Sequence, residues 1–223
     1  MHDWVGNNYD KKEKIMLTPK EKQVLIDNLI KYEGNIPHMY LDSKGYVTVG
    51  IGHLLSTVQN AQKLPFVDKD GKKATSEQIA ADYNMIAKQP KGHYAPNYRR
   101  FTKLHLKNDD ILSGVNNHIK KFESNLTVNY PGFNAFPIEA KLALFDMGFN
   151  LGVKGLKTKF PNMNRAISKK DWLTAAKESH RKPPVAEARN DYVKWLFEKA
   201  AKSTRKAGAS TVDCLRANGW RKA

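Results

Sequence analysis

The segment KYEGNIPHMYLDSKGYVTVGIGH, residues 31–53, decides the fold of this chain. It carries Glu33 at the end of a helical stretch, Asp42 nine residues later, and Thr48 six residues after that. Glycoside cleavage needs one carboxylic acid to protonate the leaving oxygen, and a second group to steer water or stabilise the cationic transition state. Two acids and a hydroxyl on different elements around a turn are typical of such a site.

A β-hairpin is expected directly after Glu33. Two stretches rich in β-forming side chains, HMYL and YVTV, flank DSKG, which has the composition of a hairpin turn. We expect Asp42 where the first strand meets the turn, and Thr48 on the returning strand, about opposite Asp42. Gly50 and Gly52 then allow another backbone or a ligand to come close.

The helix that ends near Glu33 has clear start and stop signals. Thr18 and Glu21 form a capping-box pattern with Pro19 at the first helical position, and Gly34 suits the end of the helix. Glu33 therefore lies in the last turn, beside the negative end of the helix, which disfavours the charged form of its carboxylate. A general acid needs that bias. An apolar face is predicted from four residues at helical spacing: Val24, Leu25, Leu29 and Ile30.

This pattern resembles the catalytic segment of the phage-type (T-even phage-like) lysozymes, glycoside hydrolase family 24. The matching positions are Glu33-Gly34, Tyr40, Asp42, Gly45, Thr48, Gly50 and Gly52-His53-Leu54. A second stretch, FDMGFNLG at residues 145–152, is similar to the family's central buried helix. Weaker similarity follows at residues 172–176 and 185–189, so that the resemblance covers roughly residues 17–200.

The resemblance implies a muramidase that hydrolyses the β-1,4 bond between N-acetylmuramic acid and N-acetylglucosamine in peptidoglycan. Glu33 would be the general acid, ionised Asp42 the second carboxylate, and Thr48 would hold a water against the sugar face away from Glu33. That arrangement predicts inversion, with the carboxyl groups about 6.5–9.5 Å apart. No metal or organic cofactor is implied. The substrate-binding residues that the resemblance suggests are Leu54, Phe149 and Asn150.

The expected fold is α+β and mostly α-helical, with a small β-hairpin lobe, a larger helical lobe and a cleft between them. Residues 1–16 are predicted to be a polar tail or linker, and residues 17–223 a lysozyme domain. Within that domain the catalytic segment is 33–54, and the helical lobe is about 75–217. A polar loop is expected at 64–76. Further helices are expected at 75–90, from Asn108, and at 138–151, 162–167, 170–180, 186–202 and 204–217.

Positive charge is concentrated in the last third of the chain. Residues 154–223 carry 18 Lys+Arg and 6 Asp+Glu, out of a formal net charge of +16 for the whole sequence. Such a surface suits an anionic polymer such as the cell wall, a membrane surface or nucleic acid, and it equally suits a solvated lysine-rich face. No zinc finger, RNP-type motif or GxxxxGK[ST] loop is present, so we predict no nucleic-acid partner.

Three other functions compete with the muramidase. A lytic transglycosylase also uses one glutamate, but it needs no water and would leave Asp42 and Thr48 without a task. A non-catalytic peptidoglycan-binding module would bind sacculi without releasing reducing sugar. A basic nucleic-acid-binding protein would lose DNA affinity steeply with salt.

Cell location and partners follow from features that the sequence lacks. There is no run of about eighteen apolar residues and no apolar signal-peptide core, and the lone Cys214 cannot form an intramolecular disulfide. We therefore expect a monomer that does not insert stably into membranes. It would be made in the cytoplasm and reach the wall after lysis or through a secretion device. The sequence leaves open a phage endolysin, a baseplate lysozyme, or an antibacterial effector with an immunity or inhibitor protein.

Overall fold

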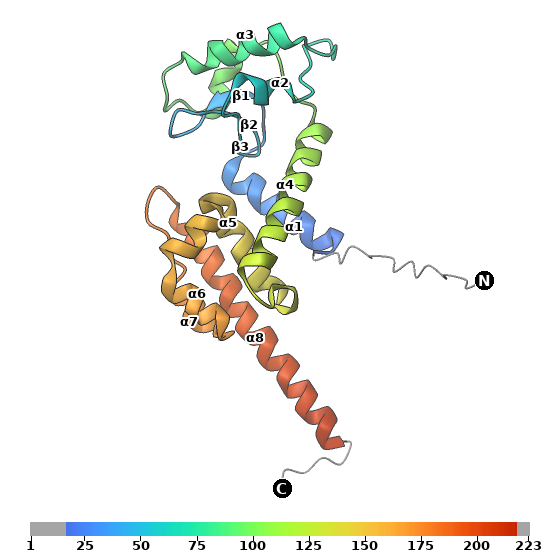
Figure 1. Ribbon diagram of the computed structural model, residues 1–223, viewed down its shortest axis with the longest axis vertical. Coiled ribbons are helices and arrows are strands. Elements are labelled where there is room, and N and C mark those ends of the chain that lie inside the picture. The colour runs from blue at the N-terminus through green and yellow to red at the C-terminus, as the bar shows by residue number, and fades with distance from the viewer. Residues whose placement is uncertain (1–16, 218–223) are drawn as a thin grey trace, which may run out of the picture.

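The structure, a computed structural model, describes the backbone of residues 17–217 and the side chains of residues 17–206. The predicted tail, residues 1–16, lies outside the described residues. Two lobes follow one another along the longest axis of the molecule, and helix α4, Asn108–Asn129, runs from one to the other (Figure 1). Helices predominate and the single sheet is small, so the expected α+β, mostly helical, two-lobed fold is confirmed.

The small lobe is built on a three-stranded antiparallel sheet with strand order β1-β2-β3. Its hairpin lies where the sequence predicted it. The 3-10 helix η1 and helix α3 pack against β1, and α2 packs against α3. The bounds of these elements are β1 Ile36–Leu41, β2 Val47–Gly50, β3 His53–Leu54, α2 Val58–Gln62, α3 Ser76–Ala87 and η1 Ala95–Phe101.

The large lobe packs helices around α5, Ile138–Lys159, whose first half is buried on nearly all sides. Edge-on and stacked aromatic rings fill the space between α5, α7 and α8, among them Phe136, Trp172 and Phe197. The other elements are α1 Pro19–Glu33, η2 Phe133–Ala135, α6 Pro161–Ser168, α7 Trp172–Lys177 and α8 Glu187–Ala217. In the part of the chain that the structure describes, no helix is both long and apolar enough to cross a membrane.

The predicted starts of the helices agree with the structure better than the predicted apolar faces do. Both capping boxes form: Thr18 begins α1, and Thr75 begins α3. On α1, however, Ile26 is buried beside Leu25 and Leu29, whereas Val24 is 46% exposed. The prediction of Val24 as a core residue was wrong. The buried stripe is centred on Leu25 and Leu29, and at 100° per residue Ile26 lies closer to that line than Val24 does.

Three other expectations also need correction. Residues 186–202 and 204–217 are one helix, α8, because Thr204 does not start a new one: its hydroxyl donates to the Ala200 carbonyl one turn back at 2.8 Å. The loop at 64–76 is partly ordered by Val67, which bridges to Lys73 and to His105. Helix α5 continues beyond residue 151 to Lys159, across a kink at Gly152, where φ is 68°. The short helix α2 was not predicted.

Candidate active site

Glu33 is the last residue of α1, as predicted, and its side chain is 27% exposed. Gly34 follows with a φ of 77°, and its N–H donates to the Ile30 carbonyl at 2.9 Å, which closes the helix. The turn between β2 and β3 approaches the same side chain. A Cβ built on Gly52 would lie 3.6 Å from Glu33 Oε2. The expected close approach at Gly52 is therefore an approach to Glu33 itself.

Asp42 organises the hairpin turn. Its Oδ1 accepts hydrogen bonds from the backbone N–H groups of Lys44 and Tyr46, both at 2.9 Å. Its own N–H donates to the Tyr46 carbonyl at 2.9 Å. One carboxylate oxygen is thus held by the turn, and this fixes the direction of the side chain.

Thr48 lies opposite Tyr40 in the hairpin, not opposite Asp42 as expected. The reason is the turn: Asp42 pairs with Tyr46, two residues before Thr48. Side chains two residues apart in a strand share a face, so Tyr40, Asp42 and Thr48 point to the same side of the sheet. Thr48 is buried, and its Oγ1 donates to the same Tyr46 carbonyl at 3.1 Å.

The phenol of Tyr40 is influenced by both candidate acids, Glu33 and Asp42. Burial raises the pKa of Tyr40 to about 12, with further contributions from the negative charges of Glu33 and Asp42. Tyr40 is therefore within electrostatic reach of both carboxylates. Thr48 lies opposite Tyr40, and the carboxylates of Glu33 and Asp42 both act on the Tyr40 phenol.

Two buried arginines belong to the ion-pair network next to Glu33, and one of them contacts it. Arg189 Nη1 donates to Glu33 Oε1 at 2.6 Å, and Arg189 Nε donates to both oxygens of Asp146 at 3.1 Å. Arg181 Nη1 donates to Asp146 Oδ1 at 2.8 Å, and Arg181 Nε donates to Asn190 Oδ1 at 3.1 Å. We call Asp146, Arg181, Arg189 and Asn190 the buried polar cluster.

Burial and charge act against each other in this cluster. Asp146 and Arg181 are each 2% exposed. Burial lowers the pKa of Arg181, although the charge of Asp146 opposes the effect. Burial also pulls down the pKa of Arg189, but the charges of Asp146 and Glu33 outweigh it and raise that pKa. The cluster holds a positive charge against Glu33 because Asp146 neutralises part of the two guanidinium groups.

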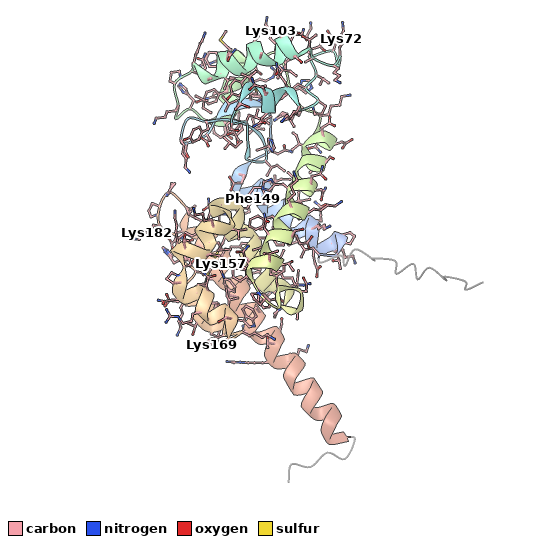
Figure 2. All side chains as sticks on the ribbon, viewed as in Figure 1. Lys72, Lys103, Phe149, Lys157, Lys169 and Lys182 are labelled. Carbon is pink, nitrogen blue, oxygen red and sulfur yellow. The ribbon has the colours of Figure 1, made fainter. Side chains whose placement is uncertain are left out.

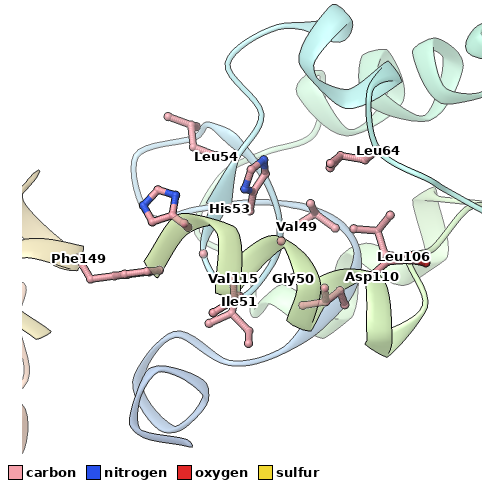
Figure 3. A pocket seen from close by; sticks show the side chains of 14 residues that line it. Val49, Gly50, Ile51, His53, Leu54, Leu64, Leu106, Asp110, Val115 and Phe149 are labelled. Atoms are coloured by element: carbon pink, nitrogen blue, oxygen red, sulfur yellow. The ribbon is translucent and has the colours of Figure 1, made fainter. Parts of the chain in front are cut away.

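Leu54 and Phe149 line one pocket of about 250 Å³ between β3, α4 and α5 (Figure 3). His53 and His118 line it too, and the His118 ring meets Phe149 edge-on at 5.2 Å between ring centres. Partial burial lowers the pKa of His53, and the neighbouring His118 lowers it further. Figure 2 shows Phe149 at the level between the two lobes, where a polymer cleft was expected.

The exposed residue Asn150 does not line this pocket. Within the described residues, no group of three or more His, Cys, Asp or Glu side chains is placed to hold a metal ion. The side chain of Cys214 lies outside the described residues.

Comparison with known proteins agrees with this geometry. No family model matches the chain. A probable T4-type lysozyme from Dictyostelium discoideum is 29% identical over 166 residues, which is 69% of this chain and 80% of the relative. This similarity supports a T4-type lysozyme-like family for the chain. The family resemblance read from the motif at residues 33–54 is thereby confirmed.

The sequence did not single out the buried polar cluster that contacts Glu33 through Arg189. Asp146 stands within a run of apolar residues in α5, and an acid in such a run signals a buried partner. Its partners, Arg181 and Arg189, lie 35 and 43 residues further along the chain. No local pattern could have indicated which arginines of the basic third would be buried.

Proposed function

We propose that the protein is a muramidase that hydrolyses the β-1,4 bond between N-acetylmuramic acid and N-acetylglucosamine in peptidoglycan. The observation that supports this most is the position of Tyr40, which lies near Glu33 and Asp42 and opposite Thr48. Two acids and a hydroxyl around one point can protonate a leaving oxygen, face a developing cation and hold a water. A T4-type lysozyme as relative supports the same reaction class.

Glu33 is proposed as the general acid despite its ion pair. Arg189 occupies Oε1, whereas Oε2 faces the backbone at Gly52. A proton on Oε2 leaves Oε1 free to accept the Arg189 hydrogen bond, so the arginine orients the acid in both protonation states. The proton passes from Oε2 to the glycosidic oxygen, the bond from that oxygen to C1 breaks, and the leaving sugar departs as an alcohol.

Asp42 and Thr48 are proposed to act on the other face of the sugar. The turn holds Asp42 Oδ1, so Oδ2 is left to face the cationic C1 and to take the proton of the attacking water. Thr48 Oγ1 donates to the Tyr46 carbonyl, and its lone pairs can accept a hydrogen bond from that water. Water adds to C1 opposite the departing oxygen, and the product anomer is therefore inverted.

Sugar rings are proposed to lie along the pocket of Leu54 and Phe149, and Asn150, which follows Phe149 but does not line the pocket, is kept as a proposed contact from the family resemblance. The flat Phe149 ring and the apolar Leu54 side chain suit the C–H faces of pyranose rings, and an aromatic side chain supplies a large contact area. The enzyme would act on the bacterial wall, as a monomer and without a cofactor.

Mass spectrometry of fragments released from purified sacculi tests the proposal. We expect fragments that end in reducing N-acetylmuramic acid, and none from Glu33→Gln. Anhydro ends would instead identify a lytic transglycosylase, and binding without any release would identify a non-catalytic wall-binding module. NMR of the first-formed anomer from a short oligosaccharide separates inversion from retention through a covalent Asp42 intermediate.

A further inference from the structure

A continuous row of aromatic rings leads away from Glu33 onto the surface of α8. The row starts at Tyr32, whose ring centre lies 6.3 Å from that of Tyr192. The Tyr192 ring stacks on Trp195 with 5.9 Å between centres and 27° between planes, and Lys199 Nζ lies 4.1 Å from the Trp195 ring centre. We call Tyr32, Tyr192, Trp195 and Lys199 the aromatic–lysine row.

Packing of the core does not explain Trp195. The core face of α8 consists of Val193, Leu196, Phe197 and Ala200, all buried, whereas Trp195 is 46% exposed. The other described tryptophan of the large lobe shows what a core position looks like. Trp172 is 2% exposed, and its Nε1 donates to Thr204 at 3.1 Å. Trp195 is thus not needed for the core, and together with Tyr192 and Lys199 it forms a contiguous surface.

Positive charge continues the row along the helix. Helical spacing places Lys202 and Lys206 on the same strip as Trp195 and Lys199, at steps of three or four residues. At the other end, Lys31 Nζ lies 5.4 Å from the Tyr32 ring centre. Two acidic residues border this strip: Asp191 lies four residues before Trp195, and Glu198 lies four residues before Lys202.

Charge alone does not distinguish this surface from the rest of the molecule. Lys72, Lys103, Lys157, Lys169 and Lys182 are spread over both lobes (Figure 2). The row differs because its lysines adjoin three neighbouring aromatic rings, the half-buried Tyr32 and Tyr192 and the exposed Trp195, and because Tyr32 is next to Glu33 in the chain. The guanidinium of Arg189, which holds Glu33, also lies over the Tyr32 ring at 5.2 Å.

We propose that the aromatic–lysine row is a second binding surface for the glycan wall polymer, outside the cleft. The inference rests on the proposed muramidase function, since the occupant is the polymer that the cleft would cut. The C–H face of a sugar carries partial positive charge and suits the negative face of an indole ring. The lysines then meet the carboxylates of the peptide stems. The row keeps the enzyme on the wall between cleavage events.

Sedimentation with purified sacculi tests this in a Glu33→Gln background, where turnover does not enter. We expect Trp195→Ala and Lys199→Glu each to weaken binding roughly 5- to 20-fold, as loss of an aromatic or cation–π contact implies. Lys194→Glu is the matched control, because it makes the same charge change on another face of α8 and should change binding less than about twofold. With Glu33 intact, Trp195→Ala and Lys199→Glu should cleave a short neutral oligosaccharide like wild type.

Two kinds of result overturn the proposal. Equal losses on sacculi and on the short oligosaccharide would mean that the row only supports α1 and Glu33. Unchanged binding to sacculi, with lost binding to duplex DNA or to phosphatidylglycerol-containing vesicles, would make the row a nucleic-acid or membrane surface. Failure of the muramidase proposal is distinguishable, since it appears as absent reducing ends from the wild-type enzyme.

Discussion

The hairpin segment, residues 36–54, and the buried polar cluster both reach Glu33, one near Oε2 and the other at Oε1. The hairpin is local: Asp42 and Thr48 follow Glu33 within fifteen residues, and short turns fix their positions. The cluster is distant: Arg189 lies 156 residues from the glutamate that it contacts. The hairpin carries the proposed chemistry, whereas the cluster holds buried charges in place. We therefore expect substitutions in the hairpin to lower activity and those in the cluster to lower stability.

The largest loss of activity should come from substitution of Glu33, which both the hairpin segment and the buried polar cluster approach. Glu33→Gln should lower the rate of sacculus cleavage by about 10²–10⁴, because the amide has no acidic proton for the leaving oxygen. Stability should change less than for Asp146→Asn, since Glu33 is 27% exposed, the amide oxygen still accepts the Arg189 hydrogen bond, and Arg189 keeps Asp146. Reducing-end release and thermal unfolding measure the two quantities on one protein sample. Turnover like that of the wild type would remove Glu33 from the mechanism.

Asp42→Asn and Thr48→Ser separate charge from geometry within the hairpin. Asp42→Asn should lower the rate by about 10²–10³, because no negative charge then faces the developing cation. Thr48→Ser keeps the hydroxyl and should retain most of the activity. Steady-state rates on one soluble oligosaccharide give both values. A larger loss for Thr48→Ser than for Asp42→Asn would contradict the roles proposed here.

Asp146→Asn tests the cluster as a stability element. Removal of the shared carboxylate leaves Arg181 and Arg189 buried with too little negative charge, and loss of one partner of a buried ion pair costs about 3–5 kcal/mol. Urea unfolding measures the change in free energy.

Glu123→Gln is the matched control for that experiment. Glu123 is a buried carboxylate on α4, and no hydrogen-bond partner for its Oε1 is found among the described residues. Burial raises its pKa. The neutral amide should therefore be tolerated, with a change in unfolding free energy of less than about 1 kcal/mol. Similar decreases in unfolding free energy for Asp146→Asn and Glu123→Gln would mean that the ion pairs of Asp146 contribute no more to stability than an unpaired buried carboxylate does.

The smallest effect concerns His38, on the hairpin but outside the candidate site. Burial lowers the pKa of His38, the Ala95 carbonyl opposes this, and the charge of Arg99 adds to the lowering. The folded state therefore binds the proton less readily than the unfolded chain, in which histidine titrates near pH 6.5. The contribution of His38 to the free energy of unfolding is therefore fully present above about pH 6.5, and it decreases as the pH drops below that value. Between pH 7.5 and pH 5, the urea midpoint of unfolding should decline less in His38→Asn than in the wild-type protein.

Sequence patterns worked best where local chemistry fixes the outcome. The capping boxes at Thr18 and Thr75 start helices because side-chain oxygens bond free N–H groups three residues away. The turn at Asp42 forms for a similar reason. The predicted break before Thr204 failed because its hydroxyl can bond a carbonyl inside the helix as well as cap a new one. The prediction for Val24 was wrong because helical periodicity locates the apolar face of a helix only to within about one residue.

The sequence by itself determined the helix end at Glu33, the hairpin, the spacing of Glu33, Asp42 and Thr48, and the excess of positive charge near the C-terminus. All of these depend on contacts between residues close in the chain or on composition. Only the tertiary structure decided that Asp146 pairs with Arg181 and Arg189, and that one of these arginines contacts Glu33. It also decided that Trp172 lies in the core and Trp195 on the surface. Burial depends on which helices pack together. That packing therefore determines the desolvation cost of each buried charge and the oppositely charged residue with which it pairs.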